Sequence, residues 1–81
     1  QILVNAEVSE EIKQAFTSGK MSEKILEYEK DFADRGWKLL VRASGTEPLI
    51  RVTIWGDSQE KIAVAAEEIA NRIKEYKDAG N

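Results

Sequence analysis

The stretch "WKLLVRASGTEPLIRVTIWG", residues 37–56, decides the fold of this chain. Apolar residues alternate along both of its halves, which is the pattern of two strands that each bury one face. A polar connection, residues 44–48, separates the halves. Its last residue, Pro48, can begin a strand without removing a needed ladder hydrogen bond. The stretch therefore predicts a β-hairpin with strands over residues 37–43 and 48–55.

The segment before the hairpin begins with a further strand. Four apolar residues alternate there with less apolar ones: Ile2, Val4, Ala6 and Val8. Ser9 can then cap a helix with Glu10 and Glu11 in its first turn, where the helix dipole favours acids. Ile12, Ala15 and Phe16 have helical spacing, and Gly19 can end this helix.

A second helical start follows at Ser22. Met21 before this cap and Leu26 after it have the spacing of a hydrophobic staple. An apolar stripe then runs to Gly36, whose missing Cβ suits a left-handed helix end: Ile25, Tyr28 or Glu29, and Phe32. Whether residues 9–36 form two helices or one helix with a break at 17–20 stays open.

The segment after the hairpin predicts one long helix. Gly56 ends the strand, and Asp57 with Glu60 has the spacing of a capping box. Apolar residues recur at helical spacing: Ile62, Ala66, Ile69, Ile73 and Tyr76. Residues 77–81 are expected to be a frayed tail. The order is β-α-β-β-α, which favours helices packed on one face of an antiparallel-rich sheet.

Composition limits the possible functions. The 81 residues carry a net charge of −3 and contain neither cysteine nor histidine, so disulfides, thiolate metal sites and histidine catalysis are excluded for this chain. The acidic balance also argues against nucleic-acid binding, because no basic stripe is present. No apolar run is long enough for a membrane span. We expect one domain over residues 1–81, from a cytoplasmic protein. Because it opens on Gln1, without an initiator methionine, we expect a piece of a longer polypeptide.

The connection of the hairpin has the chemistry of an anion site. Two arginines flank it, and hydroxyl side chains and a glycine lie between them: Arg42, Ser44, Gly45, Thr46 and Arg51. A guanidinium offers a planar fork of donors that matches two phosphate oxygens, and a glycine lets backbone amides approach an anion closely. The pattern predicts a phosphate cradle. It is not the nucleotide P-loop, because it leads into a strand.

An ordinary solvated turn is the competing interpretation, since Ser, Gly, Thr and Pro are common hairpin residues. Glu47 favours that interpretation, because a carboxylate repels a phosphate dianion. Three arrangements would remove the conflict. Glu47 can point away, pair with Arg42 or Arg51, or accept a hydrogen bond from a ligand hydroxyl. The sequence leaves all three open.

The string Arg-x-Ser-Gly-Thr-Glu-Pro-x-x-Arg-Val, residues 42–52, closely resembles the C-terminal phosphate-binding loop of the α-D-phosphohexomutase superfamily. The preceding strand, the following strand that ends at Gly56 and the closing helix agree with it. The first half of the chain agrees only in layout. The resemblance implies an α+β, TATA-binding-protein-like fold, with about four strands and two main helices on one face of the sheet. It also implies the last of four domains in an isomerase.

The resemblance implies specific roles for the residues of the connection. Arg42, Ser44, Gly45 and Thr46 would contact the non-transferring phosphate of a hexose 1-phosphate, 6-phosphate or 1,6-bisphosphate, and Arg51 would contact it or brace the loop. The parent enzyme would use a phosphoserine and Mg²⁺, both bound outside this chain, and the domain alone would be inactive. Ser44 is not the nucleophile, because no general base accompanies it.

The motif resembles those of phosphoglucosamine mutases and of the phosphomannomutase/phosphoglucomutase group, and does not separate them. The partners that it implies are the phosphosugar and the other domains of the enzyme. A non-catalytic interaction module with an ordinary hairpin is the alternative. Trp37 and Trp55 are expected in the core or at a domain interface rather than on a sugar, with Trp55 the better interface candidate. Glu67 and Glu68 are expected on a solvated helix face.

Overall fold

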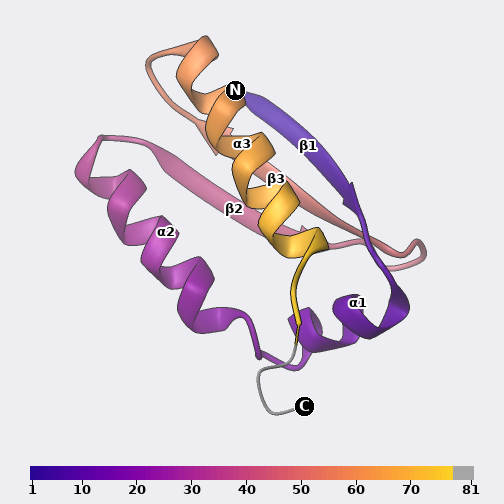
Figure 1. Cartoon of the computed structure of the whole chain (residues 1–81). Coiled ribbons are helices and arrows are strands. Elements are labelled where there is room, and N and C mark those ends of the chain that lie inside the picture. The colour runs from indigo at the N-terminus through magenta and orange to yellow at the C-terminus, as the bar shows by residue number, and fades with distance from the viewer. Residues whose placement is uncertain (78–81) are drawn as a thin grey trace.

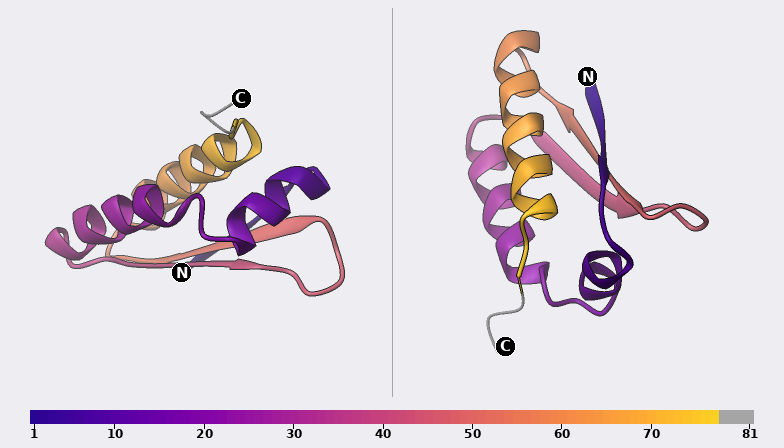
Figure 2. Two further views of the ribbon diagram at one scale, coloured as in Figure 1. Left: turned by 90° about the horizontal axis from the view of Figure 1, so that it is seen from below. Right: turned by 45° about the vertical axis from the view of Figure 1, so that its right-hand side comes forward.

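The structure, a computed structural model, describes residues 1–77. These residues form three strands and three helices: β1 (Ile2–Glu7), α1 (Glu10–Thr17), α2 (Ser22–Asp34), β2 (Lys38–Ala43), β3 (Leu49–Trp55) and α3 (Gln59–Lys74). The strands form one antiparallel sheet in the order β1-β3-β2. The helices lie on one face of this sheet and leave the other face open (Figures 1 and 2). The predicted α+β class is confirmed.

The sheet of residues 1–77 has three strands, and the expectation of about four is wrong for this part of the chain. The reason is that only three segments alternate in hydrophobicity. The 30 residues between β1 and β2 carry helical spacing and form α1, α2 and the turns beside them. Within residues 1–77, no helix is both long and apolar enough to cross a membrane. Of the expected frayed tail, residues 78–81 lie outside the described part of the chain.

The core lies between the sheet and the helices. The central strand β3 contributes three fully buried side chains, Ile50, Val52 and Ile54. Helix α3 packs across the sheet and buries the face that its sequence predicted: Ile62, Ala66, Ile69 and Ile73, with Ala65 and Ala70 beside them. The period-2 and period-3.6 patterns of the sequence thus meet in one apolar layer.

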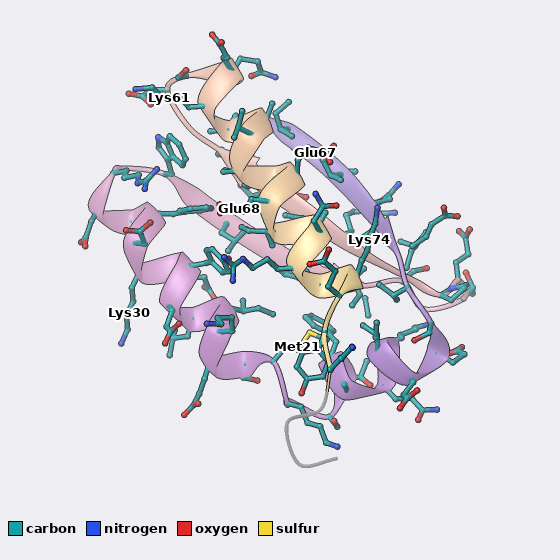
Figure 3. The ribbon with its side chains drawn as sticks, viewed as in Figure 1. Met21, Lys30, Lys61, Glu67, Glu68 and Lys74 are labelled. Carbon is teal, nitrogen blue, oxygen red and sulfur yellow. The ribbon has the colours of Figure 1, made fainter. Side chains whose placement is uncertain are left out.

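Residues 9–36 form two helices, which settles the question that the sequence left open. Gly19, at φ +89°, turns the chain between them, and Gly36, at φ +77°, follows α2 as predicted. The predicted cap and staple of α2 are wrong. Ser22 is the first helical residue, and the N-cap is Met21, which makes no side-chain cap hydrogen bond. Met21 is buried among the helices (Figure 3), whereas Leu26 is 49% exposed, because Met21 packs into the core instead of against Leu26.

The start of α3 also differs from the prediction. Ser58, not Asp57, is the N-cap, and its Oγ accepts a hydrogen bond from the amide of Lys61 at 3.3 Å. Asp57 Oδ1 instead accepts from Trp37 Nε1 at 3.0 Å. Trp37 is buried, so its indole N–H needs a partner, and Asp57 supplies it. Ser58 thus caps α3, and the adjacent Asp57 satisfies the indole N–H of Trp37.

We expect Ser58→Ala to lower the free energy of unfolding by about 1 kcal/mol, because the amide of Lys61 loses its acceptor, the Oγ of the N-cap residue. Asp57→Asn keeps an acceptor oxygen for Trp37 Nε1 and is expected to cost less than about 0.5 kcal/mol. Urea unfolding of both variants gives the two values. A larger loss in Asp57→Asn than in Ser58→Ala would show that the carboxylate caps the helix.

Candidate functional site

The two arginines of the motif form a cross-strand pair. Arg42 on β2 lies directly opposite Arg51 on β3, and Asn5 on β1 lies directly opposite Arg51 on its other side. Their neighbours Ile50 and Val52 are fully buried under the helices, so alternation places this row on the open face. Both arginine side chains are exposed. Like charges directly opposite each other in a sheet are destabilising.

Acidic side chains do not neutralise this pair. Within residues 1–77, neither Arg42 nor Arg51 forms an ion pair within 4.0 Å. Glu7 lies on the same face, one diagonal step from Arg51, without pairing with it. Arg51 Nε donates a hydrogen bond to Asn5 Oδ1 at 3.3 Å. A neutral amide thus orients one guanidinium and leaves its charge uncompensated. The row presents concentrated positive charge on a domain whose net charge is −3.

The connection between β2 and β3 turns its amides inward. The amides of Thr46 and Glu47 donate to Ser44 Oγ at 3.4 and 3.2 Å. The amide of Ser44 donates to the carbonyl of Leu49 at 3.0 Å, which closes the base of the connection. The hydroxyl of Ser44 accepts from two amides and still has its own proton to donate. The amides of Ser44, Thr46 and Glu47 are thus used within the hairpin, while the hydroxyl proton of Ser44 remains as a donor at the end of β2 that carries Arg42.

Gly45 is not required by the fold of this domain. Its φ lies outside the left-handed region, which only Gly19 and Gly36 adopt among residues 1–77. A Cβ at position 45 would meet nothing within 4 Å. The turn itself therefore gives no conformational reason for a glycine at position 45. The remaining reason for a glycine at position 45 is that a group from outside the domain approaches the backbone closely there.

Glu47 does not pair with either arginine. Its side chain is exposed, and no ion pair joins it to Arg42 or Arg51 within the described residues. Its backbone is engaged instead, because its carbonyl accepts from Lys13 Nζ at 3.0 Å and from the amide of Leu49 at 2.8 Å. Of the three arrangements that the sequence left open, pairing with an arginine is excluded in this structure.

The two tryptophans lie away from the connection. Trp37 is 7% exposed and packs edge-on against Phe32, with ring centroids 5.4 Å apart. Trp55 is half-buried on the open face, under Lys38 Nζ at 5.3 Å from its ring centroid. Because Trp55 follows Leu49 by six strand positions, it lies roughly 20 Å from the connection. A hexose held at the connection does not reach it, so Trp55 stays an interface candidate.

Metal-binding clusters are absent from the described residues, where no three acidic, histidine or cysteine side chains converge. Glu67 and Glu68 are exposed on α3, as predicted (Figure 3). Five hollows lie on the surface formed by residues 1–77, and none of these five is lined by Arg42, Arg51 or residues 44–46. The candidate site is thus an open surface rather than a pocket.

Two residues that contact this region, Asn5 and Lys13, were not predicted from the sequence. Asn5 bonds Arg51 across strands that are 46 residues apart in the chain, and Lys13 bonds the connection from α1. Asn5 carries one usable signal, since its alternation places it on the polar face of its strand. The partner strand and register were still needed to bring it to Arg51. The sequence of Lys13 and its neighbours carries no such signal.

Comparison with known proteins identifies the family of this chain. The family model of the phosphoglucomutase/phosphomannomutase C-terminal domain matches residues 3–72. The chain is 45% identical to a phosphoglucosamine mutase of Finegoldia magna over 93% of its own length and 17% of that protein. It is 40% identical to that of Caldanaerobacter subterraneus over 91% of its length and 17% of that protein, and 44% identical to that of Yersinia pestis over 90% and 15%.

The chain therefore spans about a sixth of the curated relatives that it matches. No solved structure matches it. The match to the family model covers most of residues 1–77, including both strands of the hairpin and the connection between them. This chain belongs to the family of phosphoglucomutase/phosphomannomutase C-terminal domains.

Proposed function

We propose that this domain binds the substrate phosphate in a phosphohexomutase, which interconverts a hexose 1-phosphate and 6-phosphate through a bisphosphorylated sugar. The loop Arg42–Pro48 holds the phosphate that is not being transferred. The observation that carries this proposal is the cross-strand pair of Arg42 and Arg51, which no acidic side chain of residues 1–77 neutralises. A phosphate dianion would remove their mutual repulsion and accept hydrogen bonds from both.

Each residue of the loop has a proposed task. Arg42 gives the bidentate contact, while Ser44 and Thr46 donate hydroxyl hydrogen bonds. Gly45 leaves room for the phosphate, because no atom of the domain occupies the place of its missing Cβ. Arg51, oriented by Asn5, adds charge from the neighbouring strand.

A phosphate clamp remote from the reacting oxygen can still contribute to the rate. Phosphoryl transfer depends largely on positioning and charge stabilisation, so fixing one end of the sugar places the other in line for reaction. The bisphosphorylated sugar must reverse between its two transfers. The clamp therefore recognises the phosphate dianion rather than one face of the ring. The phosphoserine and the Mg²⁺ that complete the chemistry belong to other parts of the full-length protein.

The substrate is proposed to be a phosphorylated glucosamine. The sequence motif alone does not separate the sugars, but the relatives described above are named phosphoglucosamine mutases. Residues that select the sugar are expected mainly outside this domain. An assay of the full-length protein on glucosamine and mannose phosphates decides between them.

Phosphate is expected to raise the melting temperature of the domain more than chloride does. At ten times its dissociation constant a ligand adds about 1.4 kcal/mol, which corresponds to roughly 6–10 °C for a domain of this size. Melting is measured in sodium phosphate and in sodium chloride of equal ionic strength. In Arg42→Ala the difference should vanish, and in Lys38→Ala, on the same face of β2, it should remain.

The rival interaction module makes the opposite prediction. Its hairpin is only a turn, so phosphate and chloride would have the same effect on melting, and Arg42→Ala would change neither. Equal effects of the two salts on melting, together with full activity of the Arg42→Ala enzyme, would contradict the phosphate-binding role and favour the interaction module.

A further inference from the structure

Two hydrogen bonds attach the base of the phosphate loop to the segment that contains α1. The amide of Val8 donates to the carbonyl of Pro48 at 2.9 Å. Lys13 Nζ donates to the carbonyl of Glu47 at 3.0 Å. The two acceptors are consecutive carbonyls at the end of the loop. One donor, Lys13, lies on α1, and the other, Val8, lies just before it. Figures 1 and 2 show that α1 and this connection lie at the same end of the molecule.

The capped start of α1 holds Lys13 in place. Ser9 Oγ accepts from the amide of Ile12 at 3.1 Å, and the amide of Lys13 donates to the carbonyl of Ser9 at 3.0 Å. Lys13 thus stands one helical turn after the cap, on the same side of the helix. It is partly buried, although lysines mostly lie in solvent. Its side chain therefore extends from the capped first part of α1.

Close packing does not hold the base of the loop. A hollow of about 480 Å³ lies between the loop, β1, α1 and the end of α3. Its lining residues are Glu7, Val8, Ser9, Ile12, Glu47, Pro48, Leu49 and Lys74. Glu47 and Pro48 border this hollow, and the bonds from Lys13 and Val8 add contacts from outside the hairpin to those that the hairpin makes itself.

Glu47 takes part both in the contact from Lys13 and in the hydrogen bonds inside the loop. Its amide donates to Ser44 Oγ on one side, and its carbonyl accepts from Lys13 on the other. One residue is thus held at both ends of its backbone. The Glu47 carbonyl also accepts from the amide of Leu49 at 2.8 Å, so a loss of the Lys13 contact removes the one bond to this carbonyl that comes from outside the hairpin, among the described residues.

We propose that Lys13 is a positioning residue for the phosphate loop, acting through the carbonyl of Glu47 and not by touching the substrate. This inference rests on the proposed function of the loop. It assigns a role in binding to α1, which the motif of residues 42–52 does not include.

The test compares Lys13→Met, Lys13→Arg and Lys30→Met in the full-length protein, with Arg42→Ala as the reference. Lys30 is exposed on α2 and points away from the domain (Figure 3), so its variant makes the same charge change elsewhere. Lys13→Met should raise KM for the hexose phosphate about fivefold with little change in kcat. Lys13→Arg should restore KM to within about twofold, because it keeps a charged donor, and Lys30→Met should match the wild type.

A second measurement reports on the loop without ligand. In amide NMR spectra of this 81-residue chain, Lys13→Met should shift the resonances of Thr46 and Glu47, and Lys30→Met should leave them in place. A rise in KM that Lys30→Met reproduces would mean a long-range charge effect and would overturn the positioning role.

The outcomes separate the two proposals. Unchanged KM and unchanged Thr46 and Glu47 resonances in Lys13→Met, with a large loss in Arg42→Ala, would sink the inference on Lys13 alone. Full activity of Arg42→Ala, or a full-length protein without mutase activity, would sink the phosphate loop and the inference with it.

Discussion

Arg42→Ala is expected to lower kcat/KM of the full-length enzyme about 10²- to 10³-fold, because it removes the charged bidentate contact to the phosphate. The fold should survive. Arg42 is exposed on the open face, and no hydrogen bond or ion pair of residues 1–77 that the structure shows depends on its side chain. Its removal also ends the repulsion with Arg51, so the variant domain should melt at the same temperature or slightly higher.

Two control variants give this result its meaning. Lys38→Ala removes one positive charge from the same face of β2, four residues away, and should leave kcat/KM within about twofold because Lys38 lies over Trp55 instead of beside the loop. Arg42→Lys keeps the charge but loses the planar fork, so it should recover only part of the activity. Steady-state kinetics and thermal melting of the three proteins suffice. Wild-type turnover in Arg42→Ala would contradict the phosphate role of this residue.

Gly56→Ala is expected to destabilise the domain by roughly 2–3 kcal/mol, a large part of what so small a domain has. A Cβ at position 56 would meet Ile62 Cγ2 at 2.5 Å and the indole of Trp37 at 3.0 Å. Both neighbours are buried and cannot move aside without disturbing α3 or β2. The melting temperature should fall by about 10–20 °C.

Gly45→Ala is the matched variant and should behave in the opposite way. Its Cβ meets nothing within 4 Å, and its φ is available to alanine, so the free energy of unfolding should change by less than about 0.5 kcal/mol. Phosphate binding should weaken instead, because the added methyl group occupies space at the loop. Equal losses of stability in the two variants would mean that Gly45 also serves the fold.

The periodic parts of the fold were predictable from the sequence. Alternation gave the hairpin and β1, and helical spacing gave the buried face of α3, because burial of one face requires those periods. The cap residues were less predictable. Asp57 and Ser58 are both good caps, and the choice depended on the buried indole of Trp37, which lies 20 residues away. The TATA-binding-protein-like assignment stays a prediction.

The candidate site was predictable in its residues and not in its arrangement. The alternation that predicted two strands with one buried face each also agrees with Arg42 and Arg51 lying on the open face. That the two arginines lie directly opposite each other depends on the register of the sheet, which a loop length alone does not determine. The contacts of Asn5 and Lys13 depend on how distant elements pack. The phosphate-binding roles themselves stay predictions until the variants are measured.

The central place of β3 in the sheet has a consequence for how this domain opens. Its amides are paired on both sides, so they should exchange with deuterium only when the whole domain unfolds, whereas α1 can detach by local opening. Arg51 thus lies on β3, which should exchange most slowly. Lys13, which bonds the loop, lies on α1, which should open more readily. Local opening of α1 would therefore release the contact between Lys13 and the loop while Arg51 stays in place on the central strand.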